Sequence, residues 1–295
     1  MSNDILPRMS RYSRSNQLAP IILQDRDKKI ITACYQFRFL LRTQIQSLFD
    51  IPCVTRVNLR LRKLFDYAYL DREFLPTNRG GSEALYLLGR NGITIVSEEM
   101  GLDPQIVRAR RTRDFSIASR VLEHDIQVNN ARISIINEIQ RDPRFTIKRW
   151  LDASEAECRY ERSFRGRSGK TSLRPDGFLQ VDFAGRVYSF FVEIDLSTSN
   201  HRKLEAKFHG YSEFKTLALT ERFFGIRHFN VLVLTKSPQR RDNLKQIADL
   251  IESGLFWFST NTELVSKPLT SCCWYRSGEI QARALFQSGL NVSSP

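Results

Sequence analysis

Two short acidic motifs in the second half of the sequence have the composition for metal chemistry. Asp176 lies in Pro175-Asp176-Gly177, and Glu193 and Asp195 close an apolar run as Glu193-Ile194-Asp195. Side chains alternate along a strand, so Glu193 and Asp195 share a face, and acids on neighbouring strands meet at one sheet edge. Carboxylate oxygens suit Mg²⁺ or Mn²⁺. The three acids therefore predict a divalent metal site that activates water and neutralises a scissile phosphate.

Cationic side chains follow the second acidic motif at helical spacing. Lys203, Lys207 and Tyr211 are four residues apart, so they line one face of a helix. If that face looks toward the acids, it supplies positive charge to a phosphate transition state. The candidate catalytic residues are therefore Asp176, Glu193, Asp195, Lys207 and Lys203, and the three acids are also the candidate metal ligands.

The elements that must position these residues follow from apolar periodicity. The predicted order is a long amphipathic helix, three strands, a helix, a strand, a helix and a last short strand. These elements span 116–139, 145–151, 173–181, 187–196, 200–224, 229–235, 242–253 and 256–259. We expect an α/β (α+β) domain of αβββαβ type, with a mixed sheet whose faces are covered by helices.

The first third of the chain predicts a winged helix-turn-helix. Three helical segments precede two strand-like runs, 67–75 and 83–88, which flank a turn-rich tip, and a closing helix follows at 94–100. The third helix, 54–65, has one apolar side and one polar side, as a DNA-recognition helix has. The DNA-binding candidates are Arg56, Asn58, Arg60, Arg62 and Lys63 on this helix and Arg79 at the tip. A winged helix that contacts only protein is the alternative.

Composition limits the class of protein. The chain has 295 residues, 45 Lys and Arg against 32 Asp and Glu, and a formal net charge of +13. This excess favours a polyanionic partner. Its five cysteines form no CxxC pair, and the sequence shows neither a long apolar run nor a secretory signal. A zinc finger, a secreted disulfide scaffold and a membrane protein are excluded, and we expect reduced thiols in a cytoplasmic protein.

The predicted organisation has five parts. They are a disordered basic tail at 1–24, the winged helix at 25–100, a basic linker at 101–115, the second domain at 116–285 and a short tail at 286–295. A basic segment, 159–174, joins the first two strands of the second domain. It is either a mobile surface loop or a flap that follows a DNA backbone into the site, and its DNA-binding candidates are Arg165, Arg167 and Lys170.

Together these motifs resemble known families. The order PD … ExD in an αβββαβ frame resembles the PD-(D/E)xK nuclease superfamily. More closely, RPDG … FFVEIDLST … KLEAKFHGY, with LEHDIQVNN before it, is similar to the replication-relaxation family of plasmid and mobile-element proteins. The resemblance covers roughly residues 28–235. It implies a winged helix joined to a nuclease-like domain, acting in replication, relaxation or mobilisation of plasmid-like DNA.

One departure from the nuclease pattern leaves three interpretations open. The catalytic lysine of that superfamily, two residues after Glu193, is replaced here by Asp195. In the first interpretation, Asp195 is a further metal ligand, and Lys207 or Lys203 supplies the positive charge of the missing lysine. In the second, the site is degenerate, and the domain only binds DNA or a partner. In the third interpretation, Asp195 caps the next helix or pairs with an arginine.

Two main functions therefore compete. The first is a Mg²⁺- or Mn²⁺-dependent nuclease or nickase, and the second is a non-enzymatic regulator of transcription or replication. An adaptor that binds protein is a third class. Double-stranded DNA is the expected partner, and a second copy of the chain and other replication or mobilisation proteins are further candidates. No membrane is expected.

Overall fold

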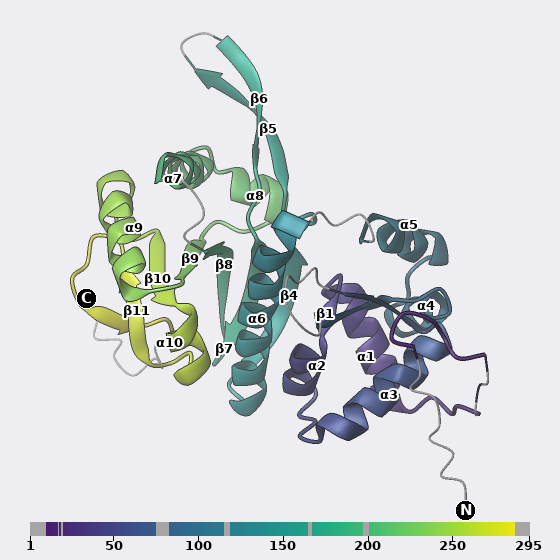
Figure 1. Cartoon of the computed structure of the whole chain (residues 1–295). Coiled ribbons are helices and arrows are strands. Elements are labelled where there is room, and N and C mark those ends of the chain that lie inside the picture. Colours follow the sequence, from purple (N-terminus) through teal and green to yellow (C-terminus); the bar gives the residue numbers. More distant parts are fainter. Residues whose placement is uncertain are drawn as a thin grey trace, which may run out of the picture. The chain divides into compact units, whose positions relative to one another are not determined.

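A computed structural model describes residues 10–16, 18, 20–74, 83–114, 119–164, 167–196 and 201–286. The chain divides into two compact units, residues 1–129 and 130–295 (Figure 1). Helix α6, Ser119–Arg141, begins in the first unit and ends in the second. Within the described residues, none of the helices combines the length and the hydrophobicity that a membrane span requires.

The first unit combines short helices with a small antiparallel sheet in the order β1-β3-β2. Its elements are α1 (Asp25–Gln36), β1 (Leu40–Leu41), α2 (Arg42–Leu48), α3 (Val54–Asp66), β2 (Leu70–Phe74), β3 (Ala84–Leu88), α4 (Gly92–Met100) and α5 (Pro104–Asp114). Helix α3 buries Val57, Leu61, Leu64 and Phe65, which recur every three or four residues and therefore form one apolar stripe. Three helices, a strand pair and a closing helix thus follow one another in the predicted order.

A tight turn after β3 fixes the start of α4. A Cβ at Gly89 would lie 2.3 Å from the main-chain oxygen of Ala68, so no larger residue fits without moving the backbone. Ala68 itself has a positive φ of 56°. The close approach of these two segments closes the small sheet against the end of α3.

Three segments outside the two predicted domains, the two tails and the basic linker, are partly ordered. The basic linker contains α5, which starts at an Asp103-Pro104 signal and buries Val107 completely. In the N-terminal tail, the N–H of Ser15 donates to Asp66 at 2.9 Å. In the C-terminal tail, Phe286 is buried among aromatic rings. Each of these segments is too polar or too short for a regular spacing of apolar residues to reveal that it packs against the rest of the chain.

The second unit contains a seven-stranded mixed sheet in the order β12-β11-β10-β9-β8-β7-β4. Strands β4, β7 and β8 are antiparallel neighbours, whereas β8, β9 and β10 run parallel. The strands are β4 (Phe145–Asp152), β7 (Gly177–Phe183), β8 (Arg186–Asp195), β9 (Asn230–Thr235), β10 (Phe256–Thr260), β11 (Cys272–Arg276) and β12 (Ala282–Ala284). The mixed α/β fold expected from the sequence is therefore confirmed.

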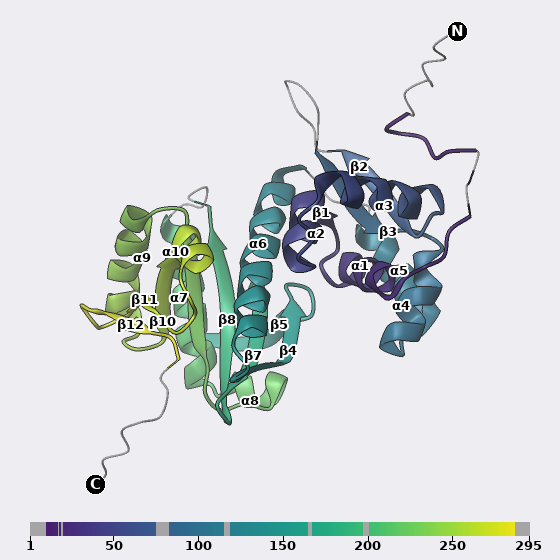
Figure 2. The ribbon, with the colours of Figure 1, turned by 90° about the horizontal axis from the view of Figure 1, so that it is seen from below.

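Helices cover both faces of this sheet (Figures 1 and 2). The helices after α6 are α7 (His201–Thr216), α8 (Leu219–Phe224), α9 (Pro238–Ile251) and α10 (Asn261–Ser266). Helices α7 and α9 share an apolar cluster with the central strands, to which they contribute Leu204, Phe208, Tyr211, Phe214, Leu244 and Ala248. Helix α6 lies on the other face. Strand β8 is central and buried on both faces, which explains its almost continuous apolar run.

Two details of the second unit differ from the prediction. The basic segment 159–174 is a β-hairpin rather than a loop, formed by β5 (Cys158–Phe164) and β6 (Arg167–Leu173). The helix expected over 200–224 is broken between α7 and α8, where Ala218 adopts a positive φ of 51°. The candidates Arg79 and Arg165 lie outside the described residues.

Candidate functional site

The fold brings Asp176 next to Glu193. Asp176 directly precedes β7, whose first residue, Gly177, pairs with Val192 on β8. The N–H of Asp176 donates to the carbonyl of Val192 at 3.0 Å, and the N–H of Ile194 donates to Oδ2 of Asp176 at 2.8 Å. These two bonds attach Asp176 to the β8 residues on either side of Glu193, so both carboxylates lie at one place on the sheet.

Glu193 is a buried carboxylate with two partners from α7. It is 3% exposed, the ammonium of Lys207 donates to its Oε2, and the hydroxyl of Tyr211 donates to its Oε1. The two donors are four residues apart, so consecutive turns of α7 present both of them to β8. Tyr211 is completely buried, which makes its hydroxyl a fixed donor rather than a solvent-exchanging one.

Burial sets the protonation behaviour of this cluster. It raises the pKa of Glu193 to about 7, although the Lys207 ammonium opposes the shift. Burial lowers the pKa of Lys207, but the carboxylates of Glu193 and Asp176 outweigh it, and the net shift is upward. Burial also raises the pKa of Tyr211 well above its ordinary value. Lys207 is therefore a cation, and Tyr211 a neutral donor, at physiological pH.

Asp195 has a different partner. Arg240, in the first turn of α9, donates to it through Nε at 2.6 Å and through Nη2 at 3.3 Å. The side chain of Asp195 is 1% exposed and that of Arg240 is 11% exposed. Of the three interpretations of Asp195, pairing with an arginine is the one that the structure shows. The sequence signal for Arg240 is Ser237-Pro238, which starts a helix directly after a strand parallel to β8.

The other candidate cation on α7 is placed differently. Lys203 lies one helical turn before Lys207 and is exposed, whereas Lys207 is half-buried against Glu193. The predicted helical face is thus split, with Lys207 and Tyr211 on the carboxylate and Lys203 in solvent. The direction of α7 relative to β8 decides which lysine reaches Glu193, and the helical periodicity of the sequence does not give that direction.

The carboxylates suit a hard divalent cation with few protein ligands. Among the described residues, no group of three His, Cys, Asp or Glu side chains is placed to hold a metal ion. Asp176 and Glu193 are two neighbouring carboxylates. Mg²⁺ is commonly held by one or two carboxylates together with water and substrate phosphates, so the donor set fits Mg²⁺ or Mn²⁺.

The polar side of α3 is only partly available to a ligand. Arg56, Asn58 and Lys63 are exposed. Arg60 instead donates from Nε to buried Asp27 at 2.6 Å, and this hydrogen bond raises the pKa of Arg60. Arg62 donates from Nε to Asp66 at 2.8 Å and from Nη1 to the carbonyl of Ser10 at 2.5 Å.

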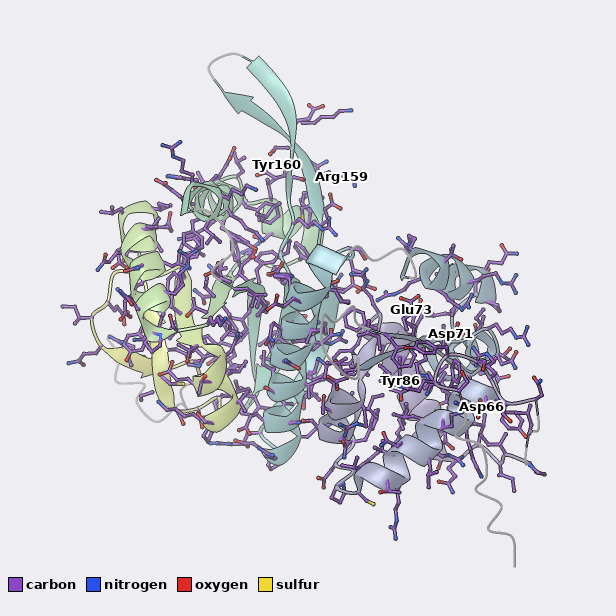
Figure 3. The ribbon with its side chains drawn as sticks, in the orientation of Figure 1. Asp66, Asp71, Glu73, Tyr86, Arg159 and Tyr160 are labelled. Atoms are coloured by element: carbon purple, nitrogen blue, oxygen red, sulfur yellow. The ribbon has the colours of Figure 1, made fainter. Side chains whose placement is uncertain are left out.

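The ring of Phe65 lies beside three arginines, which include Arg62 of α3 and Arg14 of the N-terminal segment. The guanidinium groups of Arg14, Arg62 and Arg72 lie 4.2, 5.6 and 4.2 Å from the centre of the Phe65 ring. Asp66 and Asp71, labelled in Figure 3, accept ion pairs from this group. Two of the five candidate residues on α3, Arg60 and Arg62, therefore have a structural role in the first unit.

The β5–β6 hairpin alternates between a packed face and an exposed face. Tyr160 faces the core, 5.8 Å from the ring of Phe214, whereas its neighbour Arg159 points to solvent and pairs with Glu157 (Figure 3). Lys170 is exposed and lies opposite Glu161 in the strand register. Arg167 belongs to β6. Two acids therefore offset part of the positive charge of the described hairpin: Glu157, two residues before Arg159, and Glu161, across the strand pair from Lys170.

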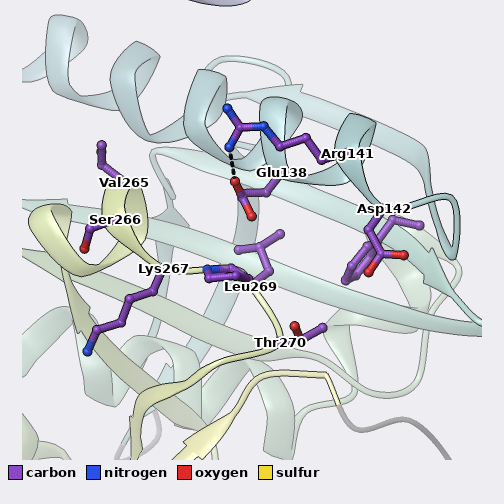
Figure 4. A pocket seen from close by; sticks show the side chains of 10 residues that line it. Glu138, Arg141, Asp142, Val265, Ser266, Lys267, Leu269 and Thr270 are labelled. Carbon is purple, nitrogen blue, oxygen red and sulfur yellow. Dashed lines mark hydrogen bonds and ion pairs between the residues drawn. The ribbon is translucent and has the colours of Figure 1, made fainter.

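A separate pocket of about 390 Å³ lies in the second unit, between the end of α6, the start of β4 and the α10 segment (Figure 4). Its lining mixes acidic, basic and apolar side chains, with Arg141 paired to Glu138 at 2.5 Å. None of the residues predicted to form the site lines this pocket.

Comparison with known proteins gives one match to a family model. The model described as Replication-relaxation matches residues 31–224, which include Asp176, Glu193, Asp195, Lys203 and Lys207. No curated protein matches the chain. Among solved structures, the restriction endonuclease FokI aligns at 9% identity and a TM-score of 0.28. That alignment covers 83% of this chain but only 44% of FokI, and at this TM-score it carries no argument.

Proposed function

The chain belongs to the replication-relaxation family, and from that premise we propose that it binds duplex DNA and nicks or cleaves it with a divalent cation. The family suggests a role in replication or relaxation. The observation that carries the proposal is the placement of Asp176 beside buried Glu193, with the Lys207 ammonium on the same carboxylate. Two acids and a lysine at one sheet edge are the groups that phosphodiester cleavage needs.

Each residue has a distinct task in the proposed reaction. Asp176 and Glu193 hold the cation, which when bound supplies an activated water and neutralises the scissile phosphate. Lys207 replaces the lysine that is missing two residues after Glu193, so positive charge comes from α7 rather than from β8. Tyr211 orients Glu193 through its hydrogen bond to Oε1. The ion pair of Asp195 with Arg240 fixes the end of β8 and neutralises Asp195, so this acid does not repel an approaching phosphate.

DNA recognition is assigned to the first unit as a winged helix. Helix α3 buries one side and exposes Arg56, Asn58 and Lys63 on the other, as a helix lying in a major groove requires. Arginine, asparagine and lysine side chains on this face include types that contact phosphates and types that contact bases.

We expect the exposed and the paired basic residues of α3 to behave differently on substitution. Arg56→Ala and Lys63→Ala should each weaken duplex binding and lower the salt slope of the affinity by about 1. Arg60→Ala should instead lower the free energy of unfolding by about 1–3 kcal/mol, because Asp27 then stays buried without its partner. Fluorescence anisotropy at several salt concentrations and urea denaturation measure the two effects. An unchanged salt slope in both exposed variants would remove α3 from the interface.

One observation favours a second function, a DNA-binding regulator without cleavage. Both oxygens of Glu193 already accept hydrogen bonds from Lys207 and Tyr211, and the usual lysine position holds an acid. A nuclease-like site that has lost its activity would keep these hydrogen-bonded residues only because they stabilise the fold. In that case, divalent cations would have no effect on any activity of the protein.

A plasmid assay separates the two functions. Supercoiled plasmid is incubated with the protein in Mg²⁺, in Mn²⁺ and in EDTA, and products are resolved on an agarose gel. We expect nicked or linear plasmid with either metal and intact plasmid in EDTA. Retarded but intact plasmid in all three conditions refutes cleavage and supports the regulator.

A further inference from the structure

The ammonium of Lys207 occupies the position on Glu193 that a cation would take. It donates to Oε2 of a carboxylate that is 3% exposed, while the lysine side chain itself is 27% exposed. We propose that Lys207 is an internal counter-cation that competes with the divalent metal for Glu193 and is released toward the bound phosphate when the metal binds. This inference rests on the proposed function and adds a regulatory step to it.

Electrostatic repulsion makes simultaneous occupancy unfavourable. Mg²⁺ lies about 2.0–2.1 Å from its oxygen ligands, so such a cation on Glu193 would lie within a few ångströms of the Lys207 nitrogen. Two cations at that separation repel strongly in a site with little water. The ammonium must therefore leave Oε2 as the metal enters.

Charge balance explains why a lysine is present in the metal-free state. When Glu193 is ionised, Asp176 and Glu193 bring two negative charges to one place, and Lys207 offsets one of them. Asp195 adds nothing to this sum, because Arg240 neutralises it. A buried acid without its counter-charge is costly, so Lys207 stabilises the site until a divalent cation replaces it.

The surroundings of Lys207 are compatible with its release, because Glu193 has a second partner and the lysine is partly exposed. Tyr211 still holds Oε1 of Glu193 from one turn further along α7, and its side chain is completely buried. Lys207 has a flexible four-carbon stem and partial access to solvent. Its ammonium can swing outward while α7 and Glu193 stay in place.

Metal binding to the full chain tests the inference. Mn²⁺ is titrated by calorimetry into the parent, Lys207→Met and Lys203→Met. We expect Lys207→Met to bind Mn²⁺ about tenfold more tightly, because the competing cation is gone. Lys203→Met removes the same charge from the same helix at an exposed position, so its affinity should stay within about twofold of the parent.

Thermal unfolding gives a second readout. Without metal, Lys207→Met should melt below the parent, since Glu193 loses its counter-charge, and Mn²⁺ should raise its melting temperature more than that of the parent. Lys207→Gln, which keeps a donor toward Glu193, serves if the Met variant does not fold. Equal or weaker Mn²⁺ binding by the Lys207 variants, or an equal gain in Lys203→Met, overturns the inference alone. No Mn²⁺ binding by any variant overturns the proposed metal site as well.

Discussion

Replacing Glu193 with Gln lowers the rate of metal-dependent plasmid nicking by about 10²–10³-fold, which is the largest effect expected on activity. The substitution keeps the volume of a buried side chain but removes the negative charge that faces Lys207. Asp176→Asn should have a comparable effect, because Asp176 is the other carboxylate proposed to hold the cation. Initial nicking rates in Mn²⁺ measure both variants.

The matched control is Glu205→Gln, the same change at an exposed position of α7. It should nick plasmid at the parental rate. Gel-shift affinity for duplex DNA should be retained in all three variants, because α3 belongs to the other compact unit. If Glu193→Gln and Asp176→Asn cut like the parent, any nicking comes from another site or from a contaminant.

The second large effect concerns stability, at the pair of Asp195 and Arg240. Asp195→Asn or Arg240→Met should each lower the free energy of unfolding by about 3–5 kcal/mol, because each leaves a buried charge without its partner. The double variant should lose much less free energy of unfolding than the sum of the two single losses, because neither charge then remains buried without a partner. Urea denaturation of the four proteins yields the coupling energy.

An exposed ion pair in the same unit provides the control for this cycle. Glu221 and Arg227 are 56% and 78% exposed, so their coupling should lie between about 0 and 1 kcal/mol. If Asp195→Asn instead leaves stability unchanged and weakens Mn²⁺ binding, Asp195 is a metal ligand. The pairing with Arg240 would then be secondary.

Much of the site follows from local patterns. The apolar run before Glu193 predicts a central strand, and Asp176 directly precedes the strand next to it, because alternation and hydrophobicity are properties of a few consecutive residues. The spacing of Lys207 and Tyr211 places both on one side of a helix for the same reason. The predicted mixed sheet and the family resemblance rest on the same short-range signals.

Other features depended on contacts between distant segments. Arg240 is 45 residues from Asp195 and Arg60 is 33 residues from Asp27, and neither spacing has a periodic signal. The polar segment 159–174 forms a hairpin because Tyr160 and Leu173 find apolar neighbours at its base, which lie elsewhere in the chain.

The sequence by itself therefore determined which elements form and which residue types each face presents, since helix and strand periods are set by covalent geometry. Only the tertiary structure decided which charges are paired. In the tertiary structure Asp195 pairs with Arg240 and Lys207 pairs with Glu193, whereas Lys203, Arg56 and Lys63 are exposed to solvent. The physical reason is that burial and ion pairing depend on where elements far apart in sequence come to lie, and a carboxylate's environment is fixed only when the sheet and its covering helices are assembled.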